Sequence, residues 1–195
     1  MLSENSSTPR SDEELQKLTV GELKPHNAPI TIVEYDPSWA ELFEREANKI
    51  RSVLGSKALQ IEHVGSTSVL GLCAKPIIDI LLVVKNSADE PSYVPALEAV
   101  SYRLQIREPG WFEHRLFKGP DTDINLHVFS EGASEIDRML CFRDWLRTND
   151  ADRDKYAQVK RNLAKNKWRH VQHYADAKTS IVREIMERAN GIRIR

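Results

Sequence analysis

Apolar and polar positions in the first part of the chain follow first the period of a strand and then that of a helix. The alternation in PITIVEY, residues 29–35, predicts a half-buried strand. Asp36 followed by Pro37 is typical of a helix start, and apolar residues then recur at helical spacing up to Gly55. We therefore expect a strand that leads directly into an amphipathic helix.

The middle of the chain has the pattern of a sheet. The run ALQIEHV predicts a short strand, and the continuous apolar run in PIIDILLVV, residues 76–84, predicts a strand buried on both faces. A short helix is expected over residues 92–100, followed by strands near YRLQIR, FEHRLFK and DINLHVF. From residue 134 the apolar stripes are helical. The prediction is an α/β (α+β) fold, with a mixed β-sheet and flanking helices over about residues 29–130 and C-terminal helices over about residues 133–190.

Composition adds limits on the class of protein. Residues 1–28 are rich in Ser, Glu, Pro and Lys, so we expect a flexible or loosely docked arm before a single domain of residues 29–195. The two cysteines exclude a disulfide framework and a Cys-based zinc site, and they indicate a reducing cytoplasm. The longest apolar run, residues 80–84, is too short to cross a bilayer, and no secretory signal precedes it. We expect a cytoplasmic protein without a membrane partner.

The net charge of −1 conceals two halves of opposite sign. Residues 1–137 carry 13 basic and 22 acidic side chains, whereas residues 138–195 carry 15 and 7, which favours an anionic partner for the second half. Arg143 and Lys160 lie next to apolar positions of the helical stripes, so they are expected to point toward the sheet and reach a ligand phosphate. We expect the other basic residues of these helices to form a face exposed to solvent. A nucleic-acid contact is the weaker alternative, since Trp168 is the only obvious stacking residue among them.

Asp79 is the residue most indicative of chemistry, because a charged side chain in a covered strand is costly unless it is paired or binds a cation. The preceding strand ends in a polar glycine turn made of Gly65, Ser66, Thr67 and Ser68. Backbone N–H groups and hydroxyls of such a turn can bind phosphate oxygens. Lys75 adds a positive charge, and Asp79 can hold a divalent cation. The structural alternative is a buried Asp79 paired with Lys75 or Arg115.

Histidines and one arginine on neighbouring predicted strands are further candidates. His63 and His127 are expected either to serve as ligands or acid-base groups or to be hydrogen-bonded strand residues. In WFEHRLF the alternation lets either His114, or else the pair of Glu113 and Arg115, face a given site. Arg115 is the better phosphate ligand, because a planar guanidinium binds phosphate oxygens in a bidentate manner.

Several strings resemble the GrpB family over roughly residues 29–170: EYDPSWAELFEREANKI, IEHVGSTSVLGLCAKPIIDILLVV, INLHVF and LCFRDWLRTND with the following Tyr156 and Lys160. The resemblance implies the nucleotidyltransferase fold of DNA polymerase beta relatives. In that fold a Gly-Ser turn and carboxylates on two strands hold two metals and a nucleoside triphosphate. Some members of the family are fused to dephospho-CoA kinase.

Carried over by position, Gly65 and Ser66 match the phosphate turn and Asp79 matches the first carboxylate, but Leu81 stands where the second belongs. Two-metal phosphoryl transfer needs several anionic ligands, which a leucine does not supply. A one-metal site with Mg or Mn therefore stays open. So does a redesigned site in which Glu62, His63 and His127 join Asp79, and these ligands suit Mn or Zn better than Mg.

Two classes of function follow from these residues. The first is a metal-dependent nucleotidyltransferase with Asp79 and His127 as catalytic residues, in which basic side chains neutralise a nucleotide's phosphates. Those side chains are Lys75, Arg115, Arg143 and Lys160. The alternative is a module that binds a nucleotide or CoA-like compound without transferring anything. A third option is a protein or RNA interaction domain that uses the basic helices.

Overall fold

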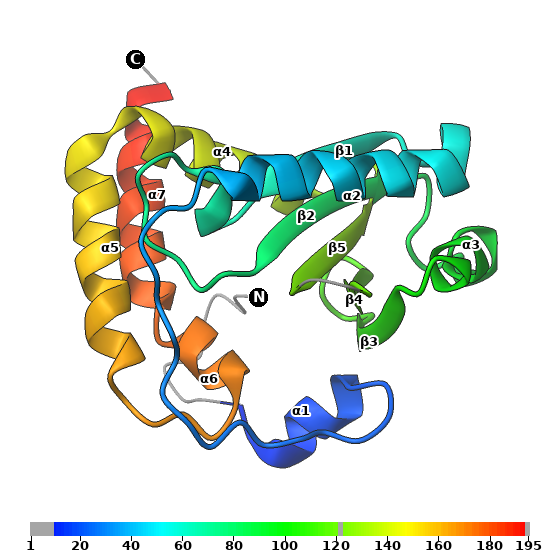
Figure 1. Ribbon diagram of the computed structural model, residues 1–195, viewed down its shortest axis with the longest axis horizontal. Coiled ribbons are helices and arrows are strands. Elements are labelled where there is room, and N and C mark those ends of the chain that lie inside the picture. Colours follow the sequence, from blue (N-terminus) through cyan, green and yellow to red (C-terminus); the bar gives the residue numbers. More distant parts are fainter. Residues whose placement is uncertain (1–9, 121–122, 194–195) are drawn as a thin grey trace.

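The computed structural model describes residues 10–120 and 123–193, and its centre is a mixed β-sheet flanked by helices (Figure 1). The described sheet has five strands in the order β1-β2-β5-β4-β3, which are Gln60–Val64, Ile78–Val84, Ile124–Ser130, His114–Lys118 and Arg103–Glu108. β2 and β5 run parallel, and every other neighbouring pair is antiparallel. The predicted mixed α/β class is confirmed.

The two faces of the sheet are covered by different helices. On the first face, α2 (Ser38–Leu54) and α3 (Val94–Ala99) pack over alternate β2 residues such as Ile80 and Leu82. On the second face, α4 (Ser134–Thr148) packs over Leu81 and Val83. This burial from both sides explains why β2 is apolar at nearly every position.

The C-terminal helices form a separate layer beside the sheet, at the left of Figure 1. α5 (Asp150–Ala164) and α7 (Thr179–Arg193) pack with α4 around Leu146, Tyr156 and Ile185. The short helix α6 (Val171–Asp176) connects α5 to α7. The predicted C-terminal helical segment is confirmed. None of the helices in the described part of the chain is long and apolar enough to cross a membrane.

Helix α2 forms where its sequence predicts. The Asp36 carboxylate accepts a hydrogen bond of 2.9 Å from the Ser38 backbone N–H, and the helix ends at Gly55, whose φ of 54° favours glycine. The apolar stripe that includes Trp39, Phe43 and Ile50 is buried against the sheet.

The strand predicted over residues 29–35 is wrong. This segment is extended, but it makes only isolated bridges, such as the one between Val33 and Ala74, and it does not join the sheet. Ile30 packs instead on Ala164 and Tyr174 of the C-terminal helices. Alternating burial against helices gives the same sequence pattern as burial in a sheet, which is why the two were not distinguished.

The described part of the predicted N-terminal arm is docked along β3. Helix α1 (Asp12–Leu18) begins with a capping box, in which Ser11 and Glu14 satisfy each other's backbone N–H groups. The Val20 N–H then donates to the Gln105 carbonyl of β3 at 2.8 Å. Leu15 is buried, so residues 10–28 contribute apolar contacts that the composition did not indicate. Residues 1–9 lie outside the described residues.

A buried carboxylate ties α2 to the chain that enters β3. Glu46 has no exposed surface, and it accepts hydrogen bonds from the Tyr102 hydroxyl at 2.8 Å and from Lys49 and Arg45. Burial raises the pKa of Glu46, but these hydrogen bonds outweigh that effect and leave the pKa below its ordinary value. The carboxylate is therefore charged, and it depends on its donors.

Substitution of Tyr102 by Phe should lower the free energy of unfolding by about 1–3 kcal/mol, because it leaves a buried carboxylate oxygen without a donor. Urea denaturation measures this loss. Tyr35→Phe is the matched control, since no described residue hydrogen-bonds the Tyr35 hydroxyl, and it should stay within about 0.5 kcal/mol of wild type. Equal stability of the two variants would contradict the role of the Tyr102 hydroxyl.

Candidate functional site

A pocket of about 500 Å³ lies over the second face of the sheet, next to the part that α4 covers. Strands β2, β5, β4 and β3 supply its floor, and the turn after β1 and helix α6 with the turn that follows it supply its sides. Helix α1 with the chain that follows it supplies a further wall. Gly65 of the turn after β1 lines the pocket together with a group of polar residues, which are Ser66, Thr67, Lys75, Asp79, Lys118, Asn125, His127, Lys160 and Lys178. The pocket therefore brings together residues from distant parts of the chain.

The register of the sheet places three of these side chains in one row. Asp79 of β2 pairs with Asn125 of β5, which pairs with Lys118 of β4, and paired residues project from the same face. The Asn125 amide donates to the Asp79 carboxylate at 2.8 Å and accepts from the Lys118 ammonium at 2.5 Å. His127, two residues after Asn125, lies on the same face with its Nε2 at 3.6 Å from Asp79 Oδ1.

Asp79 is ionised in this setting. Burial raises the pKa of its carboxyl group, but the charged form of the His127 imidazole and the hydrogen bond from the Asn125 amide stabilise the carboxylate and hold the pKa below its ordinary value. About a quarter of the side chain, 27%, remains exposed to the pocket. Asp79 is thus an accessible carboxylate, and it is not locked in a closed ion pair with Lys75 or Arg115.

Gly65 brings the turn after β1 into direct contact with this carboxylate. Its φ is 68°, and a Cβ atom built on it would lie 2.3 Å from Asp79 Oδ2. Glycine is required for both reasons, since other residues are strained at this φ and would collide with Asp79. The short helix η2 (Ser66–Ser68) follows directly. The turn and the Asp79 strand stand side by side, as the nucleotidyltransferase fold implied by the resemblance requires.

Four lysines line the pocket together with Asp79. Lys160 is almost fully buried, donates to Ser66 Oγ at 2.9 Å and to the Cys73 carbonyl, and lies over the Tyr156 ring at 4.7 Å. Burial lowers its pKa to about 7. Burial likewise lowers the pKa values of the three others, Lys75, Lys118 and Lys178.

Two of these lysines have unused hydrogen-bonding capacity. No hydrogen bond or ion pair joins the ammonium of Lys75 or Lys178 to another described residue, although Lys178 lies over the Tyr174 ring at 4.6 Å. A partly buried ammonium without an acceptor attracts an anion strongly, because the low dielectric of the pocket weakens screening.

The other residues of the polar turn serve its own structure. Thr67 Oγ1 donates to the Ile77 carbonyl at 3.2 Å, and Ser68 Oγ donates to the Gly65 carbonyl at 2.7 Å. Arg147 of α4 donates to the Ser68 carbonyl at 2.9 Å. Ser66, which accepts from Lys160, is the hydroxyl that lines the pocket together with Thr67.

His63 and Glu62 do not converge with Asp79. His63 pairs with Ile80, so its ring lies on the first face, where it stacks on Phe43 at 4.8 Å and contacts Thr67 Oγ1 at 3.0 Å. Burial lowers the pKa of His63 to about 4. Glu62 is on the second face, but its carboxylate pairs with Arg143 at 2.8 Å, away from the pocket.

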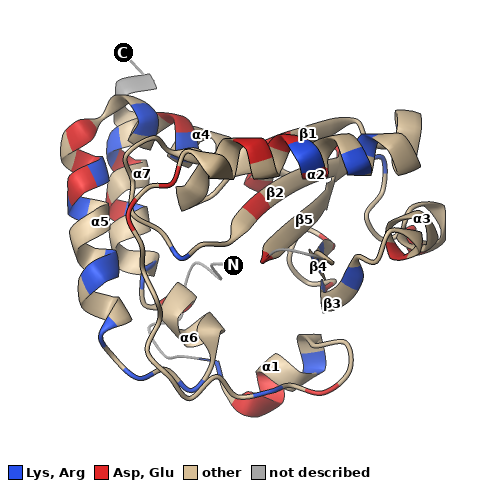
Figure 2. Cartoon of the chain, in the orientation of Figure 1, with Lys and Arg blue, Asp and Glu red and all other residues tan. Residues whose placement is uncertain are grey.

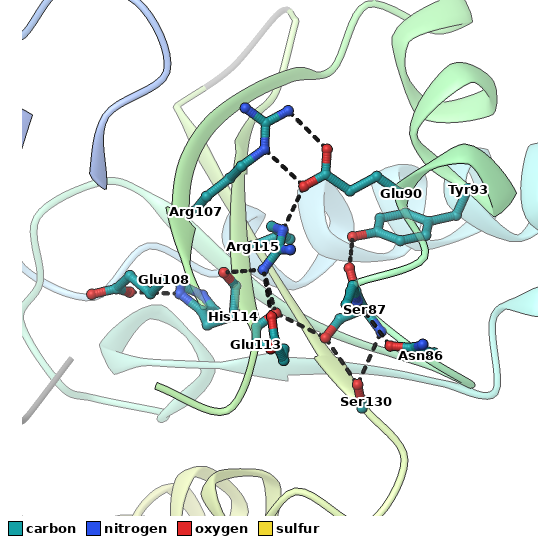
Figure 3. Close-up of polar contacts among 11 residues, drawn as sticks. Asn86, Ser87, Glu90, Tyr93, Arg107, Glu108, Glu113, His114, Arg115 and Ser130 are labelled. Carbon is teal, nitrogen blue, oxygen red and sulfur yellow. Dashed lines mark hydrogen bonds and ion pairs between the residues drawn. The ribbon is translucent and has the colours of Figure 1, made fainter. Parts of the chain in front are cut away.

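Arg143 and Arg115 also lie outside the pocket. Arg143 is held by Glu62, Asp144 and the His63 carbonyl. Arg115 is on the first face, where it donates to Glu90 at 2.6 Å and to the Glu113 carbonyl at 2.8 Å, in the network that Figure 3 shows. Of the four basic residues expected to neutralise phosphates, the structure brings Lys75 and Lys160 to the pocket and leaves these two arginines in structural ion pairs.

The residues around Asp79 do not fit the two-metal centre of the nucleotidyltransferase fold. Among the residues that the structure describes, no three His, Cys, Asp or Glu side chains are grouped so that they could hold a metal ion. Asp79 and His127 are the only pair of expected ligands that meet, and Leu81 is buried under α4. Lysines occupy the space around them, and an ammonium repels a divalent cation.

Sequence reasoning missed two of the four lysines. Lys118 had a usable signal, because strand alternation puts it on the same face as His114 and Leu116, and the register then aligns it with Asn125. Lys178 stands in the turn between α6 and α7, and no local pattern marks it.

Substitution of Gly65 by Ala should destabilise the protein by clearly more than Gly71→Ala. Both glycines have positive φ, which costs Ala about 1–2 kcal/mol, but nothing lies within 4 Å of a Cβ at Gly71. Urea denaturation of both variants measures the difference. The excess should shrink when Asp79→Ala is added, because the carboxylate is what the new Cβ meets. Equal losses for the two glycines would contradict the close approach of the turn to Asp79.

The stability that Lys160 confers should rise with pH. Its pKa is about 7 in the folded protein and 10.5 ordinarily, so between these values the unfolded chain binds more protons than the folded one. The free energy of unfolding of wild type relative to Lys160→Met should therefore increase from about pH 7 to pH 10, by up to about 1.4 kcal/mol per unit. Lys165→Met removes an exposed lysine and should give a flat difference. A flat difference for Lys160→Met as well would contradict the burial effect.

The comparisons with known proteins agree on one family. The family model described as GrpB protein matches residues 29–188. A UPF0157 protein of Halalkalibacterium halodurans is 75% identical over 191 residues, which cover 98% of each chain. A UPF0157 protein of Streptomyces coelicolor is 41% identical over 169 residues, which cover 87% of this chain and 89% of the relative.

A solved structure shows the same fold. The crystal structure of the conserved protein GrpB from Enterococcus faecalis superposes with a TM-score of 0.73 at 31% identity, and the match covers 85% of this chain and 100% of that one. The resemblance seen in the sequence strings is confirmed, and the chain belongs to the GrpB family.

Proposed function

We propose that the pocket beside the Gly65 turn binds a nucleotide or another small molecule that carries phosphate groups. The observation that carries this proposal is the convergence of Lys75, Lys118, Lys160 and Lys178 on one pocket. Asp79 and Glu108 are the acidic side chains among its described lining residues, and Glu108 is already paired with Arg10. The pocket therefore has an excess of positive charge, which a phosphate group would neutralise.

Tyr174 gives independent support. Its hydroxyl is buried and makes no hydrogen bond with any described residue, and the side chain lines the same pocket. A buried hydroxyl without a partner is costly, so such groups are normally satisfied by a ligand or an ordered water. A phosphate oxygen or another polar ligand atom would supply the partner.

The surface charges favour a small molecule over a nucleic acid. Figure 2 shows acidic and basic residues interspersed on α5 and α7. Several bases there are paired: Arg161 with Glu34 at 2.8 Å, Lys155 with Glu184 at 2.5 Å and Arg188 with Asp152 at 2.6 Å. A face whose cations are already paired releases little free energy on binding a phosphate backbone.

Binding is supported more directly than nucleotidyl transfer. Leu81 replaces one of the expected carboxylates, and lysines occupy the surroundings of Asp79. Asp79 and His127 nevertheless remain the residues that we propose for any chemistry on a bound ligand, because they are the carboxylate and imidazole that meet at the turn. Whether a divalent cation such as Mg or Mn accompanies the ligand is an outcome of the experiment below.

Thermal denaturation with pyrophosphate, ATP and CoA, each in the presence of EDTA or of Mg or Mn, tests the proposal. At least one ligand should raise the melting temperature, because it binds only the folded state. Lys75→Gln should weaken that ligand by about tenfold or more, since a charged hydrogen bond contributes about 1.5–3 kcal/mol. Lys85→Gln, which removes a lysine with an 86% exposed side chain, is the matched control and should bind like wild type.

The outcomes separate the alternatives. Absence of any shift with every ligand would contradict the proposal, as would equal effects of Lys75→Gln and Lys85→Gln. If ATP binds, release of pyrophosphate by wild type and its loss in Asp79→Ala would assign transfer, and no release by either protein would assign binding alone.

A further inference from the structure

A chain of polar side chains connects His127 through the buried His114 to Glu108 and Arg10. His127 Nδ1 lies 3.1 Å from His114 Nε2, and His114 Nδ1 lies 2.8 Å from a carboxylate oxygen of Glu108. Arg10 donates to the other oxygen of Glu108 at 3.0 Å. The geometry is that of a continuous hydrogen-bonded relay, and both of its ends, His127 and Glu108 with Arg10, line the pocket. The part from Glu108 to His114 is drawn in Figure 3.

His114 is a neutral member of this relay. It has no exposed surface, and the rings of Trp111 and Phe129 lie 5.2 and 4.7 Å from its own. Burial in this apolar setting lowers the pKa of His114 to about 4, although the neighbouring carboxylate acts against it. A neutral imidazole carries one N–H, so one of its nitrogens donates and the other accepts.

Glu108 decides which nitrogen of His114 carries the proton. Burial raises the pKa of Glu108, but the hydrogen bonds from His114 and Arg10 outweigh it and keep the pKa below its ordinary value. An ionised carboxylate only accepts hydrogen bonds, so His114 must donate from Nδ1. Its Nε2 is then an acceptor, and the 3.1 Å contact requires His127 to donate from Nδ1.

We propose that Glu108 and His114 are positioning residues that hold His127 in its Nδ1–H tautomer, so that the bare Nε2 of His127 is a proton acceptor facing the pocket. Asp79 Oδ1 lies 3.6 Å from this Nε2, which is too far for a hydrogen bond between them. Two acceptors side by side favour a ligand that presents an O–H or N–H group there. The assignment of the His127 tautomer does not depend on the proposed phosphate binding. The placement of a ligand O–H or N–H group beside Nε2 rests on that proposed function.

The relay therefore defines the place where a proton can move. A hydroxyl of a ligand that donates to Nε2 would lose its proton to that atom, while Nδ1–H stays bonded to His114. The positive charge formed on His127 would face the Asp79 carboxylate, which stabilises it. The lysines that line the pocket would hold the phosphate end of that ligand.

Nitrogen-15 NMR of the imidazole side chains tests the tautomer in the ligand-free protein. At a pH about two units above the ordinary histidine pKa of about 6.5, His127 should show a protonated Nδ1 and an unprotonated Nε2. A His127 that carries its proton on Nε2, or on both nitrogens, would overturn the proposal. This measurement needs no ligand, so failure of phosphate binding cannot be confused with failure of the relay.

Glu108→Gln should invert the relay. Arg10 keeps the oxygen of the new amide facing itself, so the amide NH₂ faces His114 Nδ1 and donates to it. His114 then carries its proton on Nε2, and His127 carries its proton on its own Nε2. A purely structural role for Glu108 would predict no change of tautomer, so a wild-type pattern in a folded Glu108→Gln protein contradicts the proposal.

Glu131→Gln is the matched control. Glu131 is exposed, its carboxylate pairs with Lys85 at 2.7 Å and it makes no hydrogen bond with His127, His114 or Glu108, so its substitution should leave the His127 signals unchanged. A change in these signals equal to that in Glu108→Gln would contradict a specific role for Glu108. If Glu108→Gln does not fold, the wild-type spectrum alone still decides which nitrogen of His127 is protonated.

Discussion

The contact between the Asp79 carboxylate and the Gly65 turn is the constraint on which the pocket depends. A charged side chain on a buried strand must be stabilised, and here Asn125 donates to it while the glycine lets the turn close against its other oxygen. Because the turn lies against β2, the Ser66 hydroxyl is placed where it accepts a hydrogen bond from Lys160 on α5. One carboxylate thus fixes the sheet, the turn and the C-terminal helices relative to one another around a cavity.

Many of the basic side chains in the second half of the chain form ion pairs with acidic side chains of the same protein. Bases of the second half pair with acids of the first: Arg143 with Glu62, Arg161 with Glu34 and Arg169 with Asp12. The last two pairs are exposed, and exposed pairs contribute about 0–1 kcal/mol each, so their effect is to cancel charge more than to stabilise the fold. The pocket is different, because its lysines outnumber its acids and are partly withdrawn from water. Two of these lysines, Lys75 and Lys118, come from the first half of the chain and two, Lys160 and Lys178, from the second, so the positive charge of the pocket is produced by the fold and not by the asymmetry of the sequence.

Sequence periodicity predicted α2, the central strands and the helical C-terminal part, because local burial patterns determine them. Asp79 and the Gly65 turn were identified for a similarly local reason, a charge in an apolar run and a glycine between polar residues. The face on which a strand residue projects was harder to predict. Arg115 and His63 lie on the first face because of their register with Val128 and Ile80, and register is a property of pairing between distant segments.

The N-terminal segment connects the two ends of the pocket. It reaches β3 through Arg10 and Glu108, and it reaches the start of α6 through Asp12, which accepts from Arg169 and contacts His170 at 3.0 Å. The contacts of Asp12 are exposed, whereas Glu108 has a side chain that is only 4% exposed. A charge at that depth needs its partners, so Arg10 helps to keep Glu108 ionised and thereby sets the protons on His114. The chemistry that His127 offers to the pocket consequently depends on a residue of the arm that composition alone would assign to a loosely attached tail.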